Sequence, residues 1–237
     1  MRAPLKIAAA QPPCSAGDVP ANAHHHVDAI LAARARIVVF PELSLTGYEL
    51  DAAAVSPDDD ALTPVVEACR AAGTIALAGA PVAGANGDRH IAMLRIDSAG
   101  TDIAYRKTFL GGAEPGRFTP GDGPVVVEVD GWRIGVGICK DTGVDQHVAG
   151  VAALAVDLYV AGLVHLPEEL DEQERRAVRI ARACDAHVAF ASFAGATGGG
   201  YDRTAGVSSI WAPDGTPIAR AGTDPGDMAR ATLPISR

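Results

Sequence analysis

Residues 132–141 of the chain read Trp-Arg-Ile-Gly-Val-Gly-Ile-Cys-Lys-Asp. The first seven residues form an apolar run that predicts a buried β-strand, and Cys139 follows this run directly. A strand holds such a thiol rigidly, while the turn after the strand opens the sulfur to a ligand. This position makes Cys139 a candidate nucleophile.

Two earlier strands end in the groups that a nucleophilic thiol needs. The strand predicted at 37–39 runs into Phe-Pro-Glu-Leu-Ser-Leu-Thr-Gly-Tyr, which places Glu42 just past the strand end. The strand predicted at 102–104 runs into Tyr-Arg-Lys-Thr-Phe-Leu, which places Lys107 in the same way. A neutral thiol attacks poorly, so a carboxylate can take its proton, and a cation can stabilise the charge that develops on a substrate.

Strands and helices alternate along the chain, with several hairpins among them. Turn signals at 97–100, 130–131 and 213–215 predict three of these hairpins. The pattern predicts a mixed, layered α/β architecture rather than a purely parallel sheet, and no linker divides the chain, so we expect one domain over 1–237. We predict strands at 5–10, 37–40, 74–80, 90–96, 102–106, 125–129, 133–138, 157–161, 187–192, 206–211, 217–221 and 228–233, and helices at 21–35, 61–72, 144–155 and 168–185.

Composition excludes several classes of protein. The 237 residues are 48% hydrophobic and 21% charged, which is typical of a globular chain with a sizeable core. A formal net charge of −9 argues against a nucleic-acid partner. No stretch is long and charge-free enough for a membrane span, and the N-terminus lacks a signal-peptide pattern, so we expect a cytoplasmic protein.

Four cysteines lie far apart, without a Cys-x-x-Cys pair, and we expect them to be reduced. Cys69 and Cys184 fall on apolar helical stripes and are predicted to be small core residues. Cys14 is predicted to pack at a strand end. Only Cys139 has a reactive setting.

A base, a cation and a thiol, in this order and each at a strand end, resemble the Glu-Lys-Cys triad of the nitrilase (carbon–nitrogen hydrolase) superfamily. The Phe-Pro-Glu-x-x-x-Thr-Gly-Tyr pattern at 40–48 matches the family, as do the loop Glu-Pro-Gly-Arg-Phe-Thr-Pro-Gly at 114–121 and the segment Gly-Val-Ser-Ser-Ile-Trp-Ala-Pro-Asp-Gly at 206–215. The resemblance covers nearly the whole chain. It implies a four-layer α-β-β-α sandwich, and a homodimer or higher homo-oligomer that pairs across helices.

The resemblance also implies a reaction. The protein would cleave a non-peptide C–N bond of a small molecule, an amide first of all, through a thioester on Cys139 and with release of ammonia or an amine. Glu42 would be the base, and Lys107 with the backbone N–H of Lys140 would bind the developing oxyanion. Glu114 would orient Lys107 and the substrate. No metal or other cofactor is implied.

The segment after Cys139 departs from the family. The family commonly continues with Tyr-Asp and then Phe-Pro-Glu, whereas this chain keeps only Asp141, and the arginine with which some ω-amidase-like members bind a carboxylate is missing. The substrate therefore stays open. A nitrilase, a carbamoyl-amine hydrolase and an acyl transferase are alternatives on the same triad, and so is a non-catalytic binding protein on the same scaffold.

Two readings of Lys140 also stay open. Its side chain could face the pocket and favour an anionic substrate, or it could pair with Asp141 or Asp145 as a structural cation. Because consecutive side chains tend to diverge, the sequence favours the structural cation.

These and other residues can also be interpreted without a functional role. Glu42, Lys107 and Glu114 could each be an ordinary loop or strand-end residue if taken alone. The glycine-rich run at 195–200 is predicted to be a flexible loop rather than part of an active-site mouth. The three histidines at 24–26 point to different faces of a helix and are not expected to bind a metal.

Overall fold

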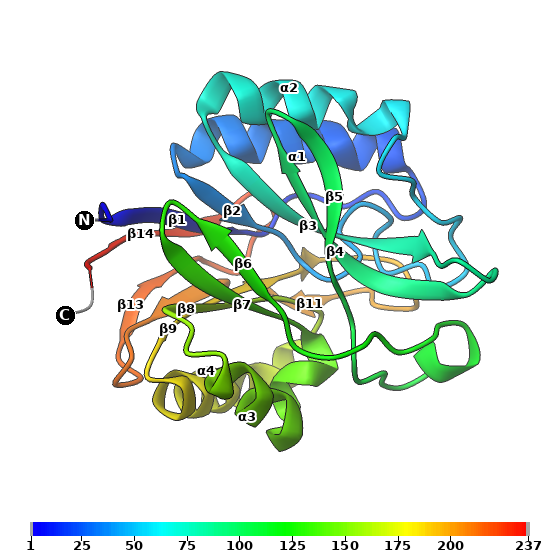
Figure 1. Ribbon diagram of the computed structural model, residues 1–237. Helices are drawn as coiled ribbons and strands as arrows, with labels where there is room; N and C mark the ends of the chain where they lie inside the picture. The colour runs from blue at the N-terminus through cyan, green and yellow to red at the C-terminus, as the bar shows by residue number, and fades with distance from the viewer. Residues whose placement is uncertain (1, 236–237) are drawn as a thin grey trace.

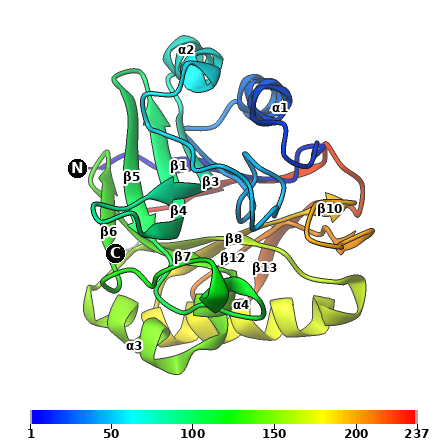
Figure 2. The same cartoon turned by 90° about the vertical axis from the view of Figure 1, so that its right-hand side faces the viewer.

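The computed structural model describes residues 2–235, and two six-stranded sheets face each other at its centre. Two helices cover the outer face of each sheet, so that the layers follow the order α-β-β-α (Figure 1). The view along the layers in Figure 2 shows one helical pair above the sheets and the other below them. The four-layer sandwich implied by the resemblance is confirmed.

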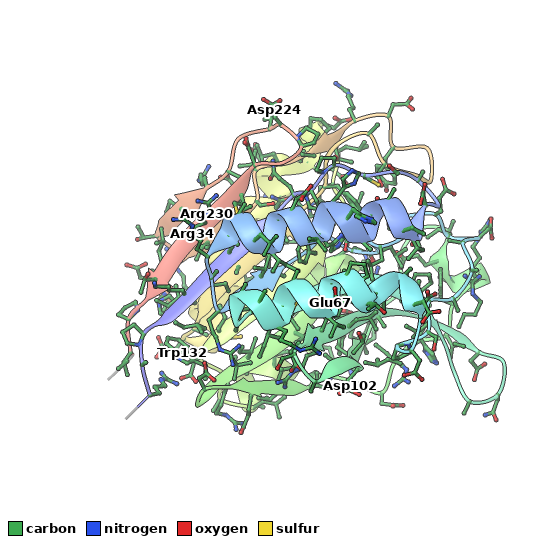
Figure 3. All side chains as sticks on the ribbon, turned by 90° about the horizontal axis from the view of Figure 1, so that it is seen from above. Arg34, Glu67, Asp102, Trp132, Asp224 and Arg230 are labelled. Atoms are coloured by element: carbon green, nitrogen blue, oxygen red, sulfur yellow. The ribbon has the colours of Figure 1, made fainter. Side chains whose placement is uncertain are left out.

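The first sheet has the strand order β14-β1-β2-β3-β4-β5. Its three central strands are parallel to one another, and the outer pairs are antiparallel. Helices α1 and α2 lie side by side across its outer face (Figure 3). The elements are β1 (Leu5–Ala10), α1 (Val19–Ala33), β2 (Ile37–Val39), α2 (Thr63–Ala72), β3 (Ile75–Ala83), β4 (Arg89–Asp97), β5 (Gly100–Arg106) and β14 (Met228–Leu233).

The second sheet has the order β13-β12-β9-β8-β7-β6, again with three parallel strands, β7, β8 and β9. Helices α3 and α4 cover its outer face. The elements are β6 (Val126–Val129), β7 (Trp132–Ile138), α3 (Asp145–Ala153), β8 (Leu158–Leu163), α4 (Leu170–Cys184), β9 (His187–Ser192), β12 (Ser209–Trp211) and β13 (Pro217–Arg220).

The central strands are buried on both faces, which explains their continuous apolar runs. One apolar cluster fills the space between the two sheets. A second lies between the first sheet and its helices, and a third lies between the second sheet and its helices. Cys69 and Cys184 lie in these outer clusters, as predicted. None of the helices within residues 2–235 is long and apolar enough to cross a membrane.

The predicted strands and helices match the observed ones, with small differences. Helix α1 begins at Val19 rather than Ala21, because Asp18 caps it and Pro20 fits its first turn. The short pair β10 (Ala194–Gly195) and β11 (Thr204–Ala205) is missing from the prediction. Two-residue strands have no period that a sequence pattern could reveal. The three predicted hairpins connect β4–β5, β6–β7 and β12–β13.

Two glycines let the sheets close tightly on the turn after β2. A methyl group at Gly162 of β8 would lie 2.6 Å from the Phe40 carbonyl oxygen and 2.7 Å from the Glu42 nitrogen. A methyl group at Gly79 of β3 would lie 2.5 Å from the Pro41 carbonyl oxygen. The backbone around Glu42 is therefore clamped between one strand of each sheet, and only glycine leaves room for it.

We expect Gly162→Ala to destabilise the protein by about 1–3 kcal/mol, because the added methyl group overpacks a rigid backbone contact. Urea unfolding measures this difference. Gly116→Ala is the matched control: Gly116 is exposed, has open space around its α-carbon and should stay within about 0.5 kcal/mol of the wild type. Equal stability of Gly162→Ala and the control would contradict the clamp.

Candidate active site

Three charged side chains meet in the interior at the ends of strands. Lys107 Nζ lies 2.6 Å from Glu42 Oε1 and 2.8 Å from each carboxylate oxygen of Glu114. All three residues are at most 1% exposed. The structure thus brings together Glu42, Lys107 and Glu114, which the sequence places 72 positions apart at the extremes.

The two carboxylates differ in their remaining partners. Glu114 accepts further hydrogen bonds from the Tyr48 hydroxyl at 2.9 Å and from the Gly111 N–H at 2.8 Å. Glu42 Oε2 is buried and has no hydrogen-bond partner within residues 2–235. Glu114 is therefore fixed in place as an acceptor, whereas Glu42 keeps one oxygen free to take a proton.

Burial raises the pKa of Glu42 well above its ordinary value, although the neighbouring Lys107 ammonium opposes the shift. Burial alone would lower the pKa of Lys107, but the charges around it, Glu42 first among them, outweigh burial and raise that pKa. Lys107 therefore stays an ammonium, and Glu42 can exchange a proton closer to neutral pH than an exposed glutamate can.

Cys139 directly follows β7 and opens a short 3₁₀ turn, Cys139–Gly143. Its φ of 38° lies in the left-handed region, which is strained for a residue other than glycine. Its Sγ lies 3.5 Å from the carbonyl oxygen of Val164, at the end of the neighbouring parallel strand β8. The thiol is partly exposed, as the sequence predicts for a group on a turn.

Asp141 holds this turn. Its carboxylate accepts hydrogen bonds from the Ile138 N–H at 3.0 Å, the Phe109 N–H at 2.8 Å and the Tyr105 hydroxyl at 2.8 Å. The buried carboxylate therefore joins the nucleophile turn to the segment that carries Lys107. This explains why Asp141 matches the family while the residues around it do not.

A cavity of about 230 Å³ opens beside these groups. The predicted residues Lys107, Glu114, Cys139 and Lys140 line it. The sequence analysis did not identify the remaining wall, which is formed by Tyr48, Gly111, Gly112, Val164, His165, Glu169, Arg176 and Tyr201.

The glycine-rich run belongs to this region. The N–H of Gly198 donates to the carbonyl of Gly47 at 2.6 Å, and the rings of Tyr48 and Tyr201 meet edge to face with centroids 5.3 Å apart. The run thus packs against the loop after Glu42 and brings Tyr201 to the cavity. The sequence favoured a flexible loop over a segment at the active-site mouth. In the structure the run lies next to the cavity, and Tyr201, which follows it, is part of the cavity wall.

Lys140 lines the cavity, and its aliphatic stem packs against Gly111. Within the described part of the chain it forms no ion pair: Arg179 contacts Asp145, and Asp141 is occupied by the groups named above. The geometry therefore favours the pocket-facing alternative over the structural cation.

The histidine run has a structural place. His26 is buried; its Nδ1 donates to the Asn22 carbonyl at 2.7 Å, and its Nε2 accepts from the Ser44 hydroxyl at 2.9 Å. Burial lowers the pKa of His26 to about 4. Among residues 2–235 no group of three or more histidine, cysteine, aspartate or glutamate side chains is arranged to hold a metal ion.

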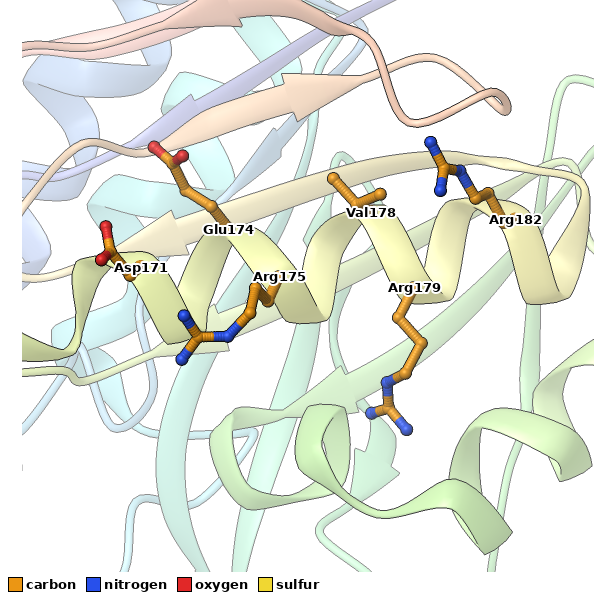
Figure 4. A pocket seen from close by; sticks show the side chains of 6 residues that line it. All are labelled: Asp171, Glu174, Arg175, Val178, Arg179 and Arg182. Carbon is orange, nitrogen blue, oxygen red and sulfur yellow. The ribbon is translucent and has the colours of Figure 1, made fainter.

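A second depression, of about 730 Å³, lies on the outer surface of α4 (Figure 4). Its wall is formed by the charged side chains of Asp171, Glu174, Arg175, Arg179 and Arg182, with Val178 among them. None of these residues lines the cavity beside Cys139. The homo-oligomer implied by the resemblance would have to use outer helical surfaces of this kind, and it stays a prediction.

Comparison with known proteins agrees with this geometry. Residues 6–237 match the carbon–nitrogen hydrolase family model. A Pseudomonas protegens protein named "hydrolase in pqqF 5′ region" is 31% identical in an alignment of 231 positions, which covers 93% of this chain and 80% of the relative.

Two solved structures of one amidase are also similar to this chain. The amidase of Nesterenkonia sp. AN1 superposes with a TM-score of 0.82 at 25% identity, covering 97% of this chain and 93% of the amidase. A cysteine-to-alanine variant of that amidase in complex with butyramide matches at 0.82 and 26% identity, with 97% and 91% coverage.

Nit3 of Saccharomyces cerevisiae, a member of branch 10 of the nitrilase superfamily, shares the fold with a TM-score of 0.86 at 19% identity, over 97% of this chain and 90% of its own. The family model and the Pseudomonas relative together show that the chain belongs to the carbon–nitrogen hydrolase family.

Proposed function

We propose that this carbon–nitrogen hydrolase cleaves a small amide through a thioester on Cys139. One observation carries the proposal: a buried Lys107 ammonium lies between two carboxylates at the cavity of Cys139, and one of them, Glu42, keeps a free oxygen. A pure binding protein gains nothing from burying these three charges next to a thiol, since their desolvation destabilises the fold.

The acylation step begins when Glu42 accepts the thiol proton and sulfur attacks the amide carbon. The carbonyl π pair moves to oxygen, and the resulting oxyanion is stabilised by Lys107 and by the backbone N–H of Lys140. Glu42 then gives its proton to the amide nitrogen, the C–N bond breaks with its electron pair on nitrogen, and ammonia or an amine leaves.

The same groups carry out the second half of the reaction. Glu42, again a carboxylate, takes a proton from water, and the hydroxyl attacks the thioester carbon. The C–S bond breaks, the thiolate regains its proton from Glu42, and a carboxylic acid leaves. Glu114 keeps Lys107 pointing at the reacting oxygen throughout.

Relatives and cavity size support an amide substrate. The Nesterenkonia amidase binds butyramide, a molecule of a size that suits a cavity of about 230 Å³. A nitrilase or a carbamoyl-amine hydrolase on the same triad would reveal itself by its substrate and products, since a carbamoyl group yields carbon dioxide and an amide does not.

The cavity of this chain is charged. Lys140 and Arg176 are cations on its wall, and Glu169 is an anion. Arg176 is contributed by α4, so a cation stands near the nucleophile although the family's arginine soon after the cysteine is missing. We therefore propose that an amide carrying a carboxylate is turned over better than its neutral counterpart.

The first prediction concerns the triad. We expect Cys139→Ala to abolish ammonia release from amides, and Glu42→Gln and Lys107→Met each to lower kcat by at least about 10²-fold, the usual effect of losing base or oxyanion assistance. Glu114→Gln should cost less than either. Cys184→Ala is the control and should keep most activity, since that thiol lies in the outer core. Normal turnover by Lys107→Met would refute the proposed mechanism.

The second prediction concerns pH. The base form of Glu42 is lost as pH falls, and because burial raises the pKa of Glu42, the acidic limb of kcat/KM should lie above pH 4.5, the ordinary pKa of a glutamate. The negative charge of Glu114 contributes to this rise in the pKa of Glu42. Glu114→Gln should therefore move the acidic limb to lower pH.

The matched control for the pH profile is Glu128→Gln, whose side chain is 69% exposed and pairs with Arg133 away from the cavity. It should leave the limb in place. A limb that stays unchanged in Glu114→Gln, or moves to higher pH, would remove Glu42 as the titrating group.

The third prediction concerns substrate charge. Succinamate differs from butyramide by a carboxylate in place of a methyl group. We expect Lys140→Met or Arg176→Met to lower the ratio of kcat/KM for succinamate to that for butyramide about tenfold, the effect of losing one charge-assisted hydrogen bond. Arg175→Met is the control, because Arg175 contacts the same Glu172 but does not line the cavity. Equal losses with both amides would leave Lys140 and Arg176 as scaffold.

A further inference from the structure

His165 borders the nucleophile but has no part in the mechanism above. It follows Val164, whose carbonyl oxygen lies 3.5 Å from Cys139 Sγ, and it forms part of the cavity wall. The residue is only 4% exposed. Buried polar groups are normally hydrogen-bonded, so a histidine buried this deeply is expected to have a partner for each ring nitrogen, in the protein or in a ligand.

The hydrogen bonds around Gln173 assign the proton of the imidazole. Gln173, on α4 and fully buried, places its Nε2 at 3.4 Å from two carbonyl oxygens, those of Gly206 and Val207. Carbonyls only accept, so this nitrogen is the donating NH₂ group and Oε1 is left as an acceptor. Oε1 lies 3.1 Å from His165 Nδ1, which therefore carries the proton.

The other ring nitrogen, Nε2, has no hydrogen-bond partner within residues 2–235 and is the one available to a ligand. Burial lowers the pKa of His165, which keeps the ring neutral. Nε2 is then a pure acceptor. Its neighbours on the cavity wall include the cations Lys140 and Arg176 and the carboxylate of Glu169, so Nε2 is a neutral acceptor among charged groups.

We propose that Nε2 of His165 accepts a hydrogen bond from the N–H of the scissile amide, and so selects substrates whose leaving group bears an N–H. The inference rests on the proposed function. An ester with the same acyl group has no hydrogen to offer at this position.

The hydrogen bond would matter most as the tetrahedral intermediate collapses. The nitrogen of a primary amide then carries two N–H bonds and a lone pair, and Glu42 must deliver its proton to the lone pair. An acceptor that holds one N–H turns the lone pair toward Glu42. Beside the buried His165, an N–H without an acceptor also loses the hydrogen bond it made to water, which disfavours the intermediate.

The test compares butyramide with methyl butyrate. Both give the same thioester, so kcat/KM reports the acylation step, where the leaving groups differ. In His165→Leu we expect kcat/KM to fall about 10- to 100-fold for butyramide and less than about threefold for methyl butyrate. His165→Gln, whose side-chain oxygen can reach the place of Nε2, should retain more amide turnover than His165→Leu.

His187→Leu is the matched control, since His187 is also 4% exposed but lies on β9, outside the cavity wall. It should leave the amide-to-ester ratio unchanged. Thermal unfolding of each variant shows whether it folds. If His165→Leu does not fold, the amide-to-ester ratios of kcat/KM in His165→Gln and Gln173→Leu test the inference instead. Gln173→Leu removes the acceptor that holds the proton on Nδ1 of His165, so that the proton can move to Nε2. It should therefore lower the ratio of kcat/KM for the amide to that for the ester.

Equal losses with amide and ester in a folded His165→Leu would overturn the inference, as would the absence of a loss with either substrate. Both results would leave the proposed function standing, provided that the wild-type protein releases ammonia from butyramide. A wild-type protein that releases no ammonia from any amide, with or without a carboxylate, would overturn both.

Discussion

The buried ammonium of Lys107 is the constraint on which the rest of this structure depends. A charged group that is 1% exposed would destabilise the fold strongly if it stood alone. Glu42 on one side and Glu114 on the other compensate it, at 2.6 and 2.8 Å. Two carboxylates around one ammonium leave a net negative charge, which favours proton uptake by Glu42. The same contacts that make the buried charge tolerable therefore also suit Glu42 to its proposed role as a base.

The geometry needed for these contacts explains the architecture. Glu42 follows a strand of the first sheet, and Cys139 follows a strand of the second. Cys139 lines the cavity, whereas Glu42 is buried behind the wall and contacts Lys107, which does line the cavity, so the two sheets must approach closely. Gly79 and Gly162 allow this approach on either side of the Glu42 backbone. Asp141 then fixes the strained turn at Cys139 by accepting hydrogen bonds from the Ile138 N–H at the end of β7 and from the Phe109 N–H in the segment after Lys107. Because the glycine contacts and the Asp141–Phe109 hydrogen bond join distant parts of the chain, the site and the sandwich stabilise each other.

Local patterns in the sequence predicted the strands, the helices and the mixed α/β class, while the resemblance to the family supplied the four-layer sandwich and Glu114. Strands buried on both faces are continuous apolar runs, and catalytic groups at strand ends stand at the borders of those runs. The cavity wall was largely missed, since His165, Arg176 and Tyr201 reach it from a loop, a helix and a glycine-rich segment without any shared motif. The sequence favoured a structural role for Lys140, whereas Lys140 lines the cavity. Side chains alternate along an extended strand, but the backbone leaves that conformation at Cys139, where φ is 38°, so the alternation does not extend to Lys140.

The residues at strand ends and the cavity-wall residues from later loops and helices have different roles in the proposed function: the first group breaks the bond, and the second recognises the substrate. The groups proposed to break the C–N bond are held by the sheets, so a change in any of them disturbs buried charges and the core together. Lys140 and Glu169 are exposed at the cavity wall and Arg176 is partly exposed, and none of the three belongs to an apolar core cluster. His165 combines features of both groups: it is buried and hydrogen-bonded like the proposed catalytic residues Glu42 and Lys107, and it lines the cavity like Lys140, Arg176 and Glu169. A residue in that position can select the leaving group without setting the acyl group, so the two halves of the substrate are recognised by separate parts of the fold.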